Sequence, residues 1–307
     1  MCGIIGVYVK RSKHIKKDIL SIYQKQSHRG KSGFGILIKK PSGLIFRKRF
    51  TKERDMMKDS IWGKISKNDI ILFHHRIPTS TPNLKQCNHP LSNEKRNIYL
   101  IHNGHINEED LDLFHYHKFE SKIKSRYGKY VEYEVTDSEI AIHYIEEAIK
   151  RGATKEEAIK ELIEKVYYSS FIIVFRDEHK LYFGSNNQVL KQFVFKKNIY
   201  IASETNYLSE DVENTVGYIR QEEIKITPII VQKRNYWSSW YGEEESTPGK
   251  DDFHDFYEEE KPDIILYSEA FKRYKEEALE CCGLCKECDM QRNCIYDFQT
   301  QGEEDFY

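Results

Sequence analysis

The hydrophobic pattern changes along the chain from strand-like to helical and back to strand-like. Short apolar runs bounded by turn residues predict buried strands, and two such runs on either side of Pro41-Ser42-Gly43 predict a hairpin. From residue 169 to residue 234 the pattern is again mostly that of strands. The strands predicted in the first part of the chain cover residues 3–9, 36–38, 44–46, 69–75 and 97–101.

Apolar positions recur at helical spacing in the middle of the chain and in one earlier segment. Residues 15–27 place Ile15, Ile19, Ile22 and Tyr23 on one face. The sequence Thr136-Asp137-Ser138-Glu139 has the residue types of a helix start. The predicted helices cover residues 15–27, 107–126, 137–150 and 154–166.

The order of these elements predicts an α+β fold. Strands, then helices, then strands do not make the regular βαβ alternation of a doubly wound parallel sheet. Two sheets with helices outside them fit this order better. Three glycines between Gly30 and Gly35, just after the first predicted helix, mark a tight turn that other backbone approaches closely.

The length, charge and apolar runs of the chain exclude some classes of protein but do not identify its function. The 307 residues allow one large or two modest domains. A formal net charge of −1 gives no reason to expect a nucleic-acid or membrane partner. The longest apolar runs, such as residues 171–175, are too short to span a bilayer, and no apolar signal segment opens the chain. We therefore expect a cytoplasmic protein whose cysteines stay reduced.

The composition shifts near residue 240, which predicts a domain boundary. Between Tyr241 and Glu260 there are nine acidic residues against one lysine, as in an exposed linker. A helical pattern over 264–280 then leads into a cysteine cluster. We predict a main domain over residues 2–234, an acidic linker over 235–262 and a helical, Cys-rich tail over 263–307.

The tail holds five of the seven cysteines. Four of them form a Cys-x₂-Cys-x₂-Cys-x₅-Cys pattern, and four thiolates in a short loop suit tetrahedral zinc or an iron–sulfur cluster. Unmetallated thiols remain the alternative, because zinc loops more often come as two separated Cys-x₂-Cys pairs. The predicted ligands are Cys282, Cys285, Cys288 and Cys294, with Cys281 as an alternative.

The second residue is a cysteine, which carries a specific chemical possibility. If an aminopeptidase removes Met1, Cys2 offers a thiol nucleophile and an α-amine base in one residue. The unperturbed pKa values, about 8.5 for the thiol and roughly 7.7–8.0 for the amine, allow easy proton exchange near neutral pH. The other interpretation is that Cys2 is merely a small residue after the initiator.

Four further motifs follow Cys2-Gly3-Ile4 in order: His28-Arg29-Gly30, Arg76-Ile77-Pro78-Thr79, His102-Asn103-Gly104 and Thr136-Asp137. This ordered set, over about residues 2–230, resembles the glutaminase domain of class II glutamine amidotransferases, which are N-terminal-nucleophile hydrolases. The resemblance implies a four-layer αββα sandwich of two mainly antiparallel sheets. It also implies that L-glutamine is hydrolysed to glutamate and ammonia through a Cys2 thioester, with no cofactor for this chemistry.

The resemblance implies a role for each matching residue. Cys2 would be nucleophile and base, while the Asn103 side chain and the Gly104 N–H would form the oxyanion hole. Arg76 would hold the α-carboxylate of glutamine, because its planar guanidinium suits a bidentate contact. The remaining implied roles are an ammonium contact for Asp137, a further substrate contact for Thr79 and an orienting contact for Arg29.

Each motif taken alone has a simpler interpretation. Asn103-Gly104 is a common turn sequence, Arg76 could be a surface ion-pair partner, and Asp137 could be a helix cap. The histidines in these motifs are expected to be structural, and Cys87 an ordinary packing thiol. Ile77-Pro78 and Ser80 depart from many members of the family, in a loop expected to close over glutamine.

The remaining length leads to an expectation about partners. Residues 235–307 are too few for a synthase domain that consumes ammonia, so we expect an ammonia-accepting synthase or transferase on another chain. Two alternatives stay open. One is an amidohydrolase that acts on another amide. The other is a catalytically retired fold that serves as a metal-stapled binding module.

Overall fold

The computed structural model describes residues 2–78, 81–106, 117–127, 130–221, 223–229 and 231. The chain divides into two units after Val231, and the described residues all belong to the first unit. The predicted acidic linker (235–262) and Cys-rich tail (263–307) lie outside the described residues, so both stay predictions. In the described part of the chain, no helix is both long and apolar enough to cross a membrane.

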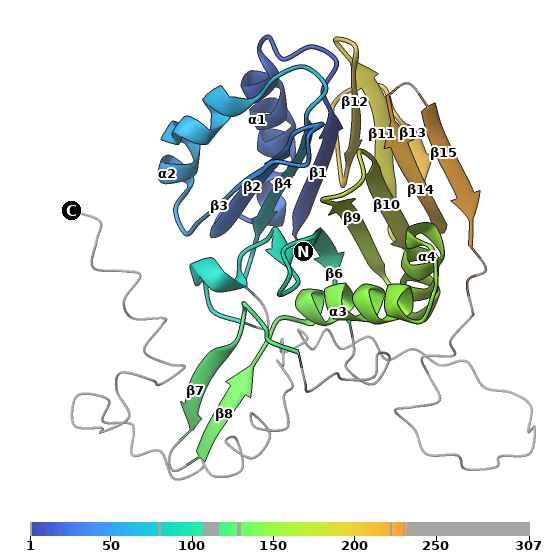
Figure 1. The fold of residues 1–307 in the computed structure, drawn as a ribbon. Coiled ribbons are helices and arrows are strands. Elements are labelled where there is room, and N and C mark those ends of the chain that lie inside the picture. The colour runs from blue at the N-terminus through green and yellow to red at the C-terminus, as the bar shows by residue number, and fades with distance from the viewer. Residues whose placement is uncertain are drawn as a thin grey trace, which may run out of the picture. The chain divides into compact units, whose positions relative to one another are not determined.

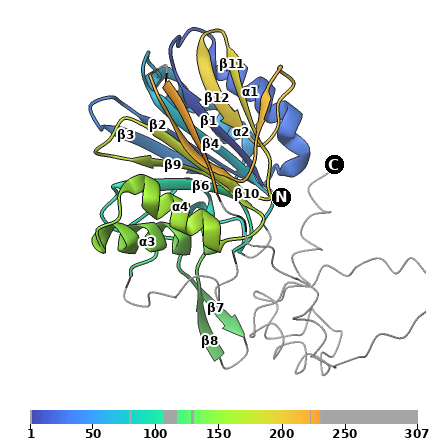
Figure 2. The ribbon, with the colours of Figure 1, turned by 90° about the vertical axis from the view of Figure 1, so that its right-hand side faces the viewer.

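Two antiparallel sheets form the centre of the first unit (Figures 1 and 2). The first contains β1 (Gly3–Tyr8), β2 (Gly33–Lys39), β3 (Ile45–Phe50), β4 (Ile70–Arg76), β11 (Leu190–Phe195), β12 (Asn198–Ala202) and β13 (Glu210–Val212), in the order β13-β11-β12-β1-β4-β2-β3. The second contains β5 (Leu91–Ser92), β6 (Ile98–Gly104), β9 (Ser169–Phe175), β10 (Leu181–Asn186), β14 (Thr215–Arg220) and β15 (Glu223–Pro228), in the order β15-β14-β10-β9-β6-β5.

Helices cover the outer face of each sheet (Figure 2). Against the first sheet pack α1 (Ile15–Gln26), α2 (Glu53–Lys58) and the 3₁₀ turn η2 (Ser60–Lys64). Against the second pack α3 (Asp137–Lys150) and α4 (Lys155–Lys165). Short 3₁₀ turns also occur at η1 (Ser27–Arg29) and η3 (Lys85–Cys87). The expected four-layer αββα sandwich is thus confirmed.

The central strands are buried on both faces, which explains their unbroken apolar sequences. In β1, Ile4 and Tyr8 pack in the core between the two sheets, while Ile5 and Val7 pack against the helices. Strands β4 and β9 divide their side chains in the same way. Because side chains alternate across a strand, a strand covered on both sides needs apolar residues at every position.

One predicted helix is wrong within the described residues. Residues 107–126 were expected to be helical, but Ile123–Tyr127 form strand β7, which pairs with β8 (Tyr130–Glu134) in a separate two-stranded hairpin. The two strands are separated in sequence by Gly128-Lys129, a connection typical of hairpins. The turn residues Gly128-Lys129 thus favour a hairpin over the helix that the apolar spacing predicted. Residues 107–116 lie outside the described part of the chain.

The start of α3 confirms the predicted helix boundary. Thr136 has extended backbone angles at the N-cap position, and Asp137 is the first residue of the helix. The capping box of α4 is also present, since Thr154 accepts from the Glu157 N–H and the Glu157 carboxylate accepts from the Thr154 N–H.

The strand register brings the ends of three strands, β1, β4 and β6, to one edge of the two sheets. Strands β1 and β4 run antiparallel with Gly3 opposite His75, so the beginning of β1 lies beside the end of β4. Strand β6 belongs to the other sheet and ends at Gly104. Residues that precede β1 or end β4 and β6 can therefore meet across the gap between the sheets.

Gly6 controls how closely the sheets approach. A Cβ on Gly6 would lie 2.9 Å from Cγ2 of Ile172 on the opposite sheet, closer than real side chains come. We predict that Gly6→Ala lowers the free energy of unfolding by about 1–3 kcal/mol through overpacking. Gly63→Ala is the matched control, because no atom lies within 4 Å of its would-be Cβ.

Urea denaturation followed by circular dichroism measures both variants. Gly63→Ala should be neutral or stabilising by up to about 1 kcal/mol, since it only restricts the unfolded chain. Equal denaturation midpoints for the two variants would contradict the close-approach argument.

Candidate active site

Cys2 lies immediately before β1 and is tied to the opposite sheet. Its backbone nitrogen donates a hydrogen bond to Oδ1 of Asn103, at 3.0 Å, across 101 residues of sequence. Asn103 sits one residue before the end of β6 and is 3% exposed. Because a short side chain on a strand end has little freedom, this bond fixes the backbone at Cys2 in the gap between the sheets.

Asn103 is itself held by polar side chains of the second sheet. Its Nδ2 donates to Oε1 of Gln188 at 2.7 Å, and the same Oε1 accepts a bond from the Ser170 hydroxyl at 3.0 Å. One Asn103 amide proton is therefore committed to Gln188. Because an amide NH₂ carries two protons, the second can serve another acceptor.

Gly104 has a backbone conformation that explains the residue type. Its φ of +140° lies outside the range that L side chains readily adopt. A Cβ here would also lie 2.6 Å from the Ser169 hydroxyl and 2.6 Å from the carbonyl oxygen of Tyr168. The Asn103-Gly104 pair ends strand β6, so its interpretation as a simple two-residue hairpin turn does not hold.

Arg76 ends β4 and is not a surface residue. It is 5% exposed, and its Nη1 donates to the carbonyl of Cys87 at 2.7 Å. Its Nη2 donates to the carbonyl and the hydroxyl of Thr81, at 2.9 and 3.0 Å. These contacts use part of a five-proton donor set, so the fixed guanidinium keeps donors for a further acceptor.

Asp137 is positioned by backbone groups at the start of α3. Its Oδ2 accepts from the N–H of Ile106 at 3.0 Å, just beyond β6, and its Oδ1 accepts from the N–H of Ser138 at 2.7 Å. The side chain is 17% exposed. Thr136, not Asp137, occupies the cap position. The carboxylate therefore connects the end of β6 to the helix.

The electrostatics of the Cys2 thiol join these residues into one site. Burial raises the pKa of the thiol above its ordinary value, while the positive charge of Arg76 opposes this rise. The negative charge of Asp137 raises the thiol pKa further, and the backbone N–H of Ile77 lowers it. Arg76, Asp137 and Ile77 thus all act on the same sulfur atom.

Arg29 supports the backbone at the other side of Cys2. Its Nη1 donates to the Cys2 carbonyl at 3.4 Å, and its Nε donates to Oε1 of Glu204 at 2.6 Å. His28 Nε2 lies 3.2 Å from the same Glu204 oxygen. Arg29 thus connects the main chain at Cys2 to Glu204, and its expected orienting role stays a prediction.

Two histidines near these strand ends, His75 and His102, have hydrogen-bond partners that hold their rings. His75 hydrogen-bonds the Gly30 carbonyl at 2.8 Å and the Gln26 side chain at 3.2 Å, and a Cβ on Gly3 would lie 1.9 Å from its ring. His102 lies between the hydroxyls of Ser138 and Ser169, at 2.9 and 3.2 Å. Burial lowers the pKa of each of these two imidazoles to about 4, so both are neutral.

The structure brings Cys2, Asn103, Arg76 and Asp137 together, with Gly104 next to Asn103 and Arg29 behind Cys2. Thr79 and the tail cysteines lie outside the described residues. Sequence analysis missed Gln188, Ser170 and Glu204, which hold Asn103 and Arg29 in place. The sequence marks two of them only by their place: Gln188 follows a connector between predicted strands, and Glu204 begins another.

Comparisons with known proteins found relatives of similar sequence and structure. Glutamine–fructose-6-phosphate aminotransferase (isomerizing) from Sulfurisphaera tokodaii is 27% identical over 247 residues, which are 75% of this chain and 38% of that protein. The enzyme of the same name from Sulfolobus acidocaldarius is 29% identical over 211 residues, covering 66% of this chain and 33% of that protein. The chain thus spans less than two fifths of the length of either relative. No protein-family model matches it.

Solved structures share the fold. The allosteric regulatory enzyme of purine biosynthesis matches with a TM-score of 0.55 and 17% identity, over 74% of this chain and 49% of that one. Glutamine phosphoribosylpyrophosphate amidotransferase from B. subtilis matches with a TM-score of 0.53 and 16% identity, with the same coverage. These structures show that the chain has the fold of the N-terminal-nucleophile hydrolases, and with the curated relatives they show that it is similar to the class II glutamine amidotransferases.

Proposed function

We propose that the first unit hydrolyses L-glutamine to glutamate and ammonia, with Cys2 as the nucleophile after removal of Met1. The observation that carries this proposal is the bond between the Cys2 nitrogen and Asn103 Oδ1, at 3.0 Å. It puts the nitrogen that would become the α-amine, and the thiol of the same residue, beside an amide side chain. Arg76 and Asp137 lie close enough to affect the thiol electrostatically.

The first half-reaction forms a thioester. The Cys2 amine accepts the thiol proton, and the sulfur attacks the side-chain carbonyl carbon of glutamine. The C–N bond of the amide then breaks, and the proton returns from the amine to the departing nitrogen, which leaves as ammonia. The raised thiol pKa makes this internal base necessary, because the free thiol is protonated at neutral pH.

The second half-reaction hydrolyses the thioester. The amine activates a water, whose oxygen attacks the γ-glutamyl carbon, and the sulfur leaves as the thiol when it regains a proton. Each tetrahedral intermediate carries a negative oxygen. The free amide proton of Asn103 and the N–H of Gly104 are the donors that we propose for this oxygen.

Arg76 and Asp137 support free glutamine as the substrate rather than another amide. A buried guanidinium with donors to spare suits an α-carboxylate, and a carboxylate on the other side suits an α-ammonium. The charges of Arg76 and Asp137 both act on the Cys2 sulfur. A glutamine whose α-carboxylate and α-ammonium contact these two residues would therefore place its side-chain amide beside the thiol. No described contact favours a peptide or another amide.

The names of the curated relatives suggest a use for the ammonia. The curated relatives are named as aminotransferases of fructose 6-phosphate, and this chain spans less than two fifths of each. We propose that a synthase or transferase, fused to this unit or associated with it, accepts the ammonia. The glutaminase steps above require no cofactor. Zinc, or an iron–sulfur cluster, at Cys282, Cys285, Cys288 and Cys294 stays a prediction for the tail.

A glutamine analogue with an electrophilic side chain tests the nucleophile. We expect one analogue per chain, attached at Cys2, in protein that has lost Met1. The buried Cys87 serves as internal control, since its thiol should stay unlabelled. Cys2→Ser should lose labelling and at least about 10³-fold of the glutaminase rate. Full activity in Cys2→Ser, or in protein that retains Met1, would exclude this mechanism.

Arg76→Lys tests recognition of the free amino acid. We predict that KM for glutamine rises about tenfold or more, with a smaller change in kcat, because a lysine cannot reproduce the bidentate contact. Arg49→Lys is the matched control, since Arg49 is partly buried and also donates to a carbonyl of the same loop, that of Gln86. If both variants raise KM equally, Arg76 acts by supporting the loop.

The pH dependence of Cys2 alkylation tests the electrostatic arrangement without glutamine. The rate should rise with pH as the thiol ionises. Because the charge of Asp137 raises the thiol pKa, Asp137→Asn should shift the profile to lower pH; because Arg76 lowers it, Arg76→Gln should shift the profile to higher pH. A shift of one pKa unit changes the rate about tenfold below the pKa. Shifts in the same direction would refute the arrangement.

A further inference from the structure

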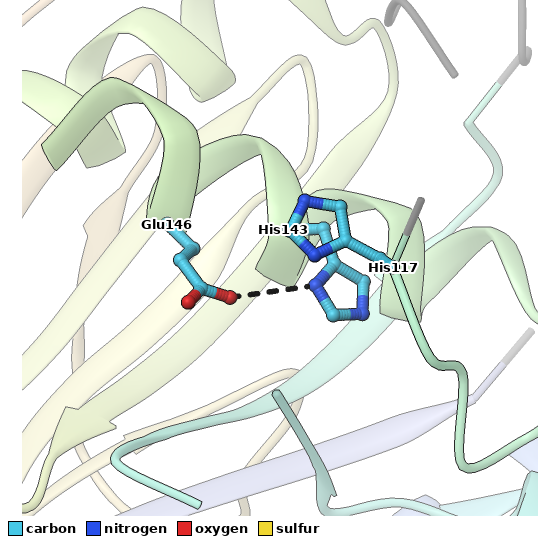
Figure 3. Close-up of side chains that lie close together, drawn as sticks. All are labelled: His117, His143 and Glu146. Atoms are coloured by element: carbon cyan, nitrogen blue, oxygen red, sulfur yellow. Dashed lines mark ion pairs between the residues drawn. The ribbon is translucent and has the colours of Figure 1, made fainter. Parts of the chain in front are cut away.

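A second group of reactive side chains lies on α3, outside the Cys2 site. His143 and Glu146 are three residues apart on this helix, and His117 approaches them from the chain segment before β7 (Figure 3). One ligand atom from each of the three residues lies within 4.8 Å of the other two. Among the described residues, these three are the His, Cys, Asp or Glu side chains that lie close enough together to hold one metal ion.

The His143 ring is buried without a hydrogen-bond partner. Its side chain is fully inaccessible, and within the described part of the chain neither ring nitrogen makes a hydrogen bond. The nearest carboxylate oxygens lie 3.5 Å from Nδ1, on Glu146, and 3.9 Å from Nε2, on Glu139. Burying a polar ring in this way is costly, and a ligand that binds the nitrogen would remove the cost.

Glu146 presents its two oxygens to different surroundings. Its Oε1 lies 3.4 Å from Lys95 Nζ and 3.8 Å from Lys150 Nζ, toward solvent. Its Oε2 points inward to His143, as Figure 3 shows, and has no hydrogen-bond partner among the described residues. Two inward-facing ligand atoms, one nitrogen and one oxygen, therefore face each other at 3.5 Å.

This separation is the one that a tetrahedral metal ion requires. Zinc bonds of about 2.0–2.1 Å place neighbouring ligand atoms about 3.4 Å apart. A ligand atom of His117 lies within 4.8 Å of the other two, and its ring stacks on His143 with ring centroids 4.1 Å apart, so the His117 ring would rotate to bind the ion as a third ligand. Two imidazoles with one carboxylate are a ligand set suited to zinc.

The surrounding carboxylates favour a cation and can orient the rings. Glu147 Oε1 lies 3.1 Å from Nε2 of His117, and Glu94 Oε1 lies 3.8 Å from its Nδ1. A carboxylate thus stands beside either nitrogen, whichever one binds the ion. Metal-bound histidines usually have such a partner on the other nitrogen, which fixes the ring.

We propose that His117, His143 and Glu146 form a binding site for a divalent metal ion, zinc by the chemistry of its ligands, that clips the segment before β7 onto α3. This segment already contacts the helix start, because Glu120 and Ser121 donate backbone N–H bonds to the Glu139 carboxylate. The helix also carries Asp137, six residues or about 9 Å before His143. The ion would therefore stabilise the framework of the site rather than take part in its chemistry.

Zinc binding to the full-length chain tests this proposal. We expect the wild-type chain to hold one more equivalent of Zn²⁺ than His143→Gln or Glu146→Gln, measured by elemental analysis after dialysis against trace zinc. Any metal bound by the tail cysteines is common to all variants and cancels in the comparison. His14→Asn is the matched control, because it removes an exposed imidazole on the opposite helical layer and should change nothing.

Thermal denaturation with and without added Zn²⁺ provides the second readout. Zinc should raise the melting temperature of the wild type and of His14→Asn by several degrees, and should have less effect on both cluster variants. Glu146→Gln keeps the shape of its residue, so the comparison survives if His143→Gln folds poorly. Equal metal content, or equal zinc effects in all four proteins, would overturn the proposal. In that case His143 would be a buried ring that packs against His117 beside Glu146, without a metal.

Discussion

The site depends on holding one end of the chain between two sheets. A chain terminus has few neighbours to fix it, yet Cys2 is bound through its nitrogen by Asn103 of the second sheet and through its carbonyl by Arg29. Asn103 is fixed in turn by Gln188, and Arg29 by Glu204. Cys2, the proposed nucleophile, is thus positioned by main-chain contacts that leave its side chain available for chemistry. Positioning of this kind contributes to a rate because the reacting groups lose their freedom before the substrate arrives.

The double-sheet architecture is what makes this contact possible. Strands β1 and β4 bring Cys2 and Arg76 to one edge of the first sheet, while β6 and α3 bring Asn103 and Asp137 to the same edge of the second. The two sheets must approach closely for a short asparagine to span the gap, and Gly6 permits this approach opposite Ile172. Packing in the core between the sheets therefore determines geometry at the site, although none of the packed residues is one of the site residues.

The sequence was sufficient to predict the strands, most helices and the residues that meet at Cys2, because each has a local or an ordered signal. Continuous apolar runs marked the strands buried on both faces, and the five motifs appeared in order. The partners Gln188, Ser170 and Glu204 could not be predicted, since long-range hydrogen bonds leave no local pattern. Strand β7 (Ile123–Tyr127) was predicted as the end of a helix, because Gly128-Lys129 was not interpreted as a hairpin turn. The group around His143 was missed because His117 and Glu146 lie 29 residues apart and carry no motif.

The central claim is that the α-amine of Cys2, freed by loss of Met1, and its thiol together form a γ-glutamyl thioester from glutamine. Intact-mass and peptide mass spectrometry of the chain, quenched in acid during turnover of glutamine, measures this most directly. We predict an N-terminal peptide that begins at Cys2 and carries one γ-glutamyl group, with the unmodified peptide returning once glutamine is exhausted. A peptide that retains Met1, or a γ-glutamyl group on any other residue during glutamate release, would contradict the account.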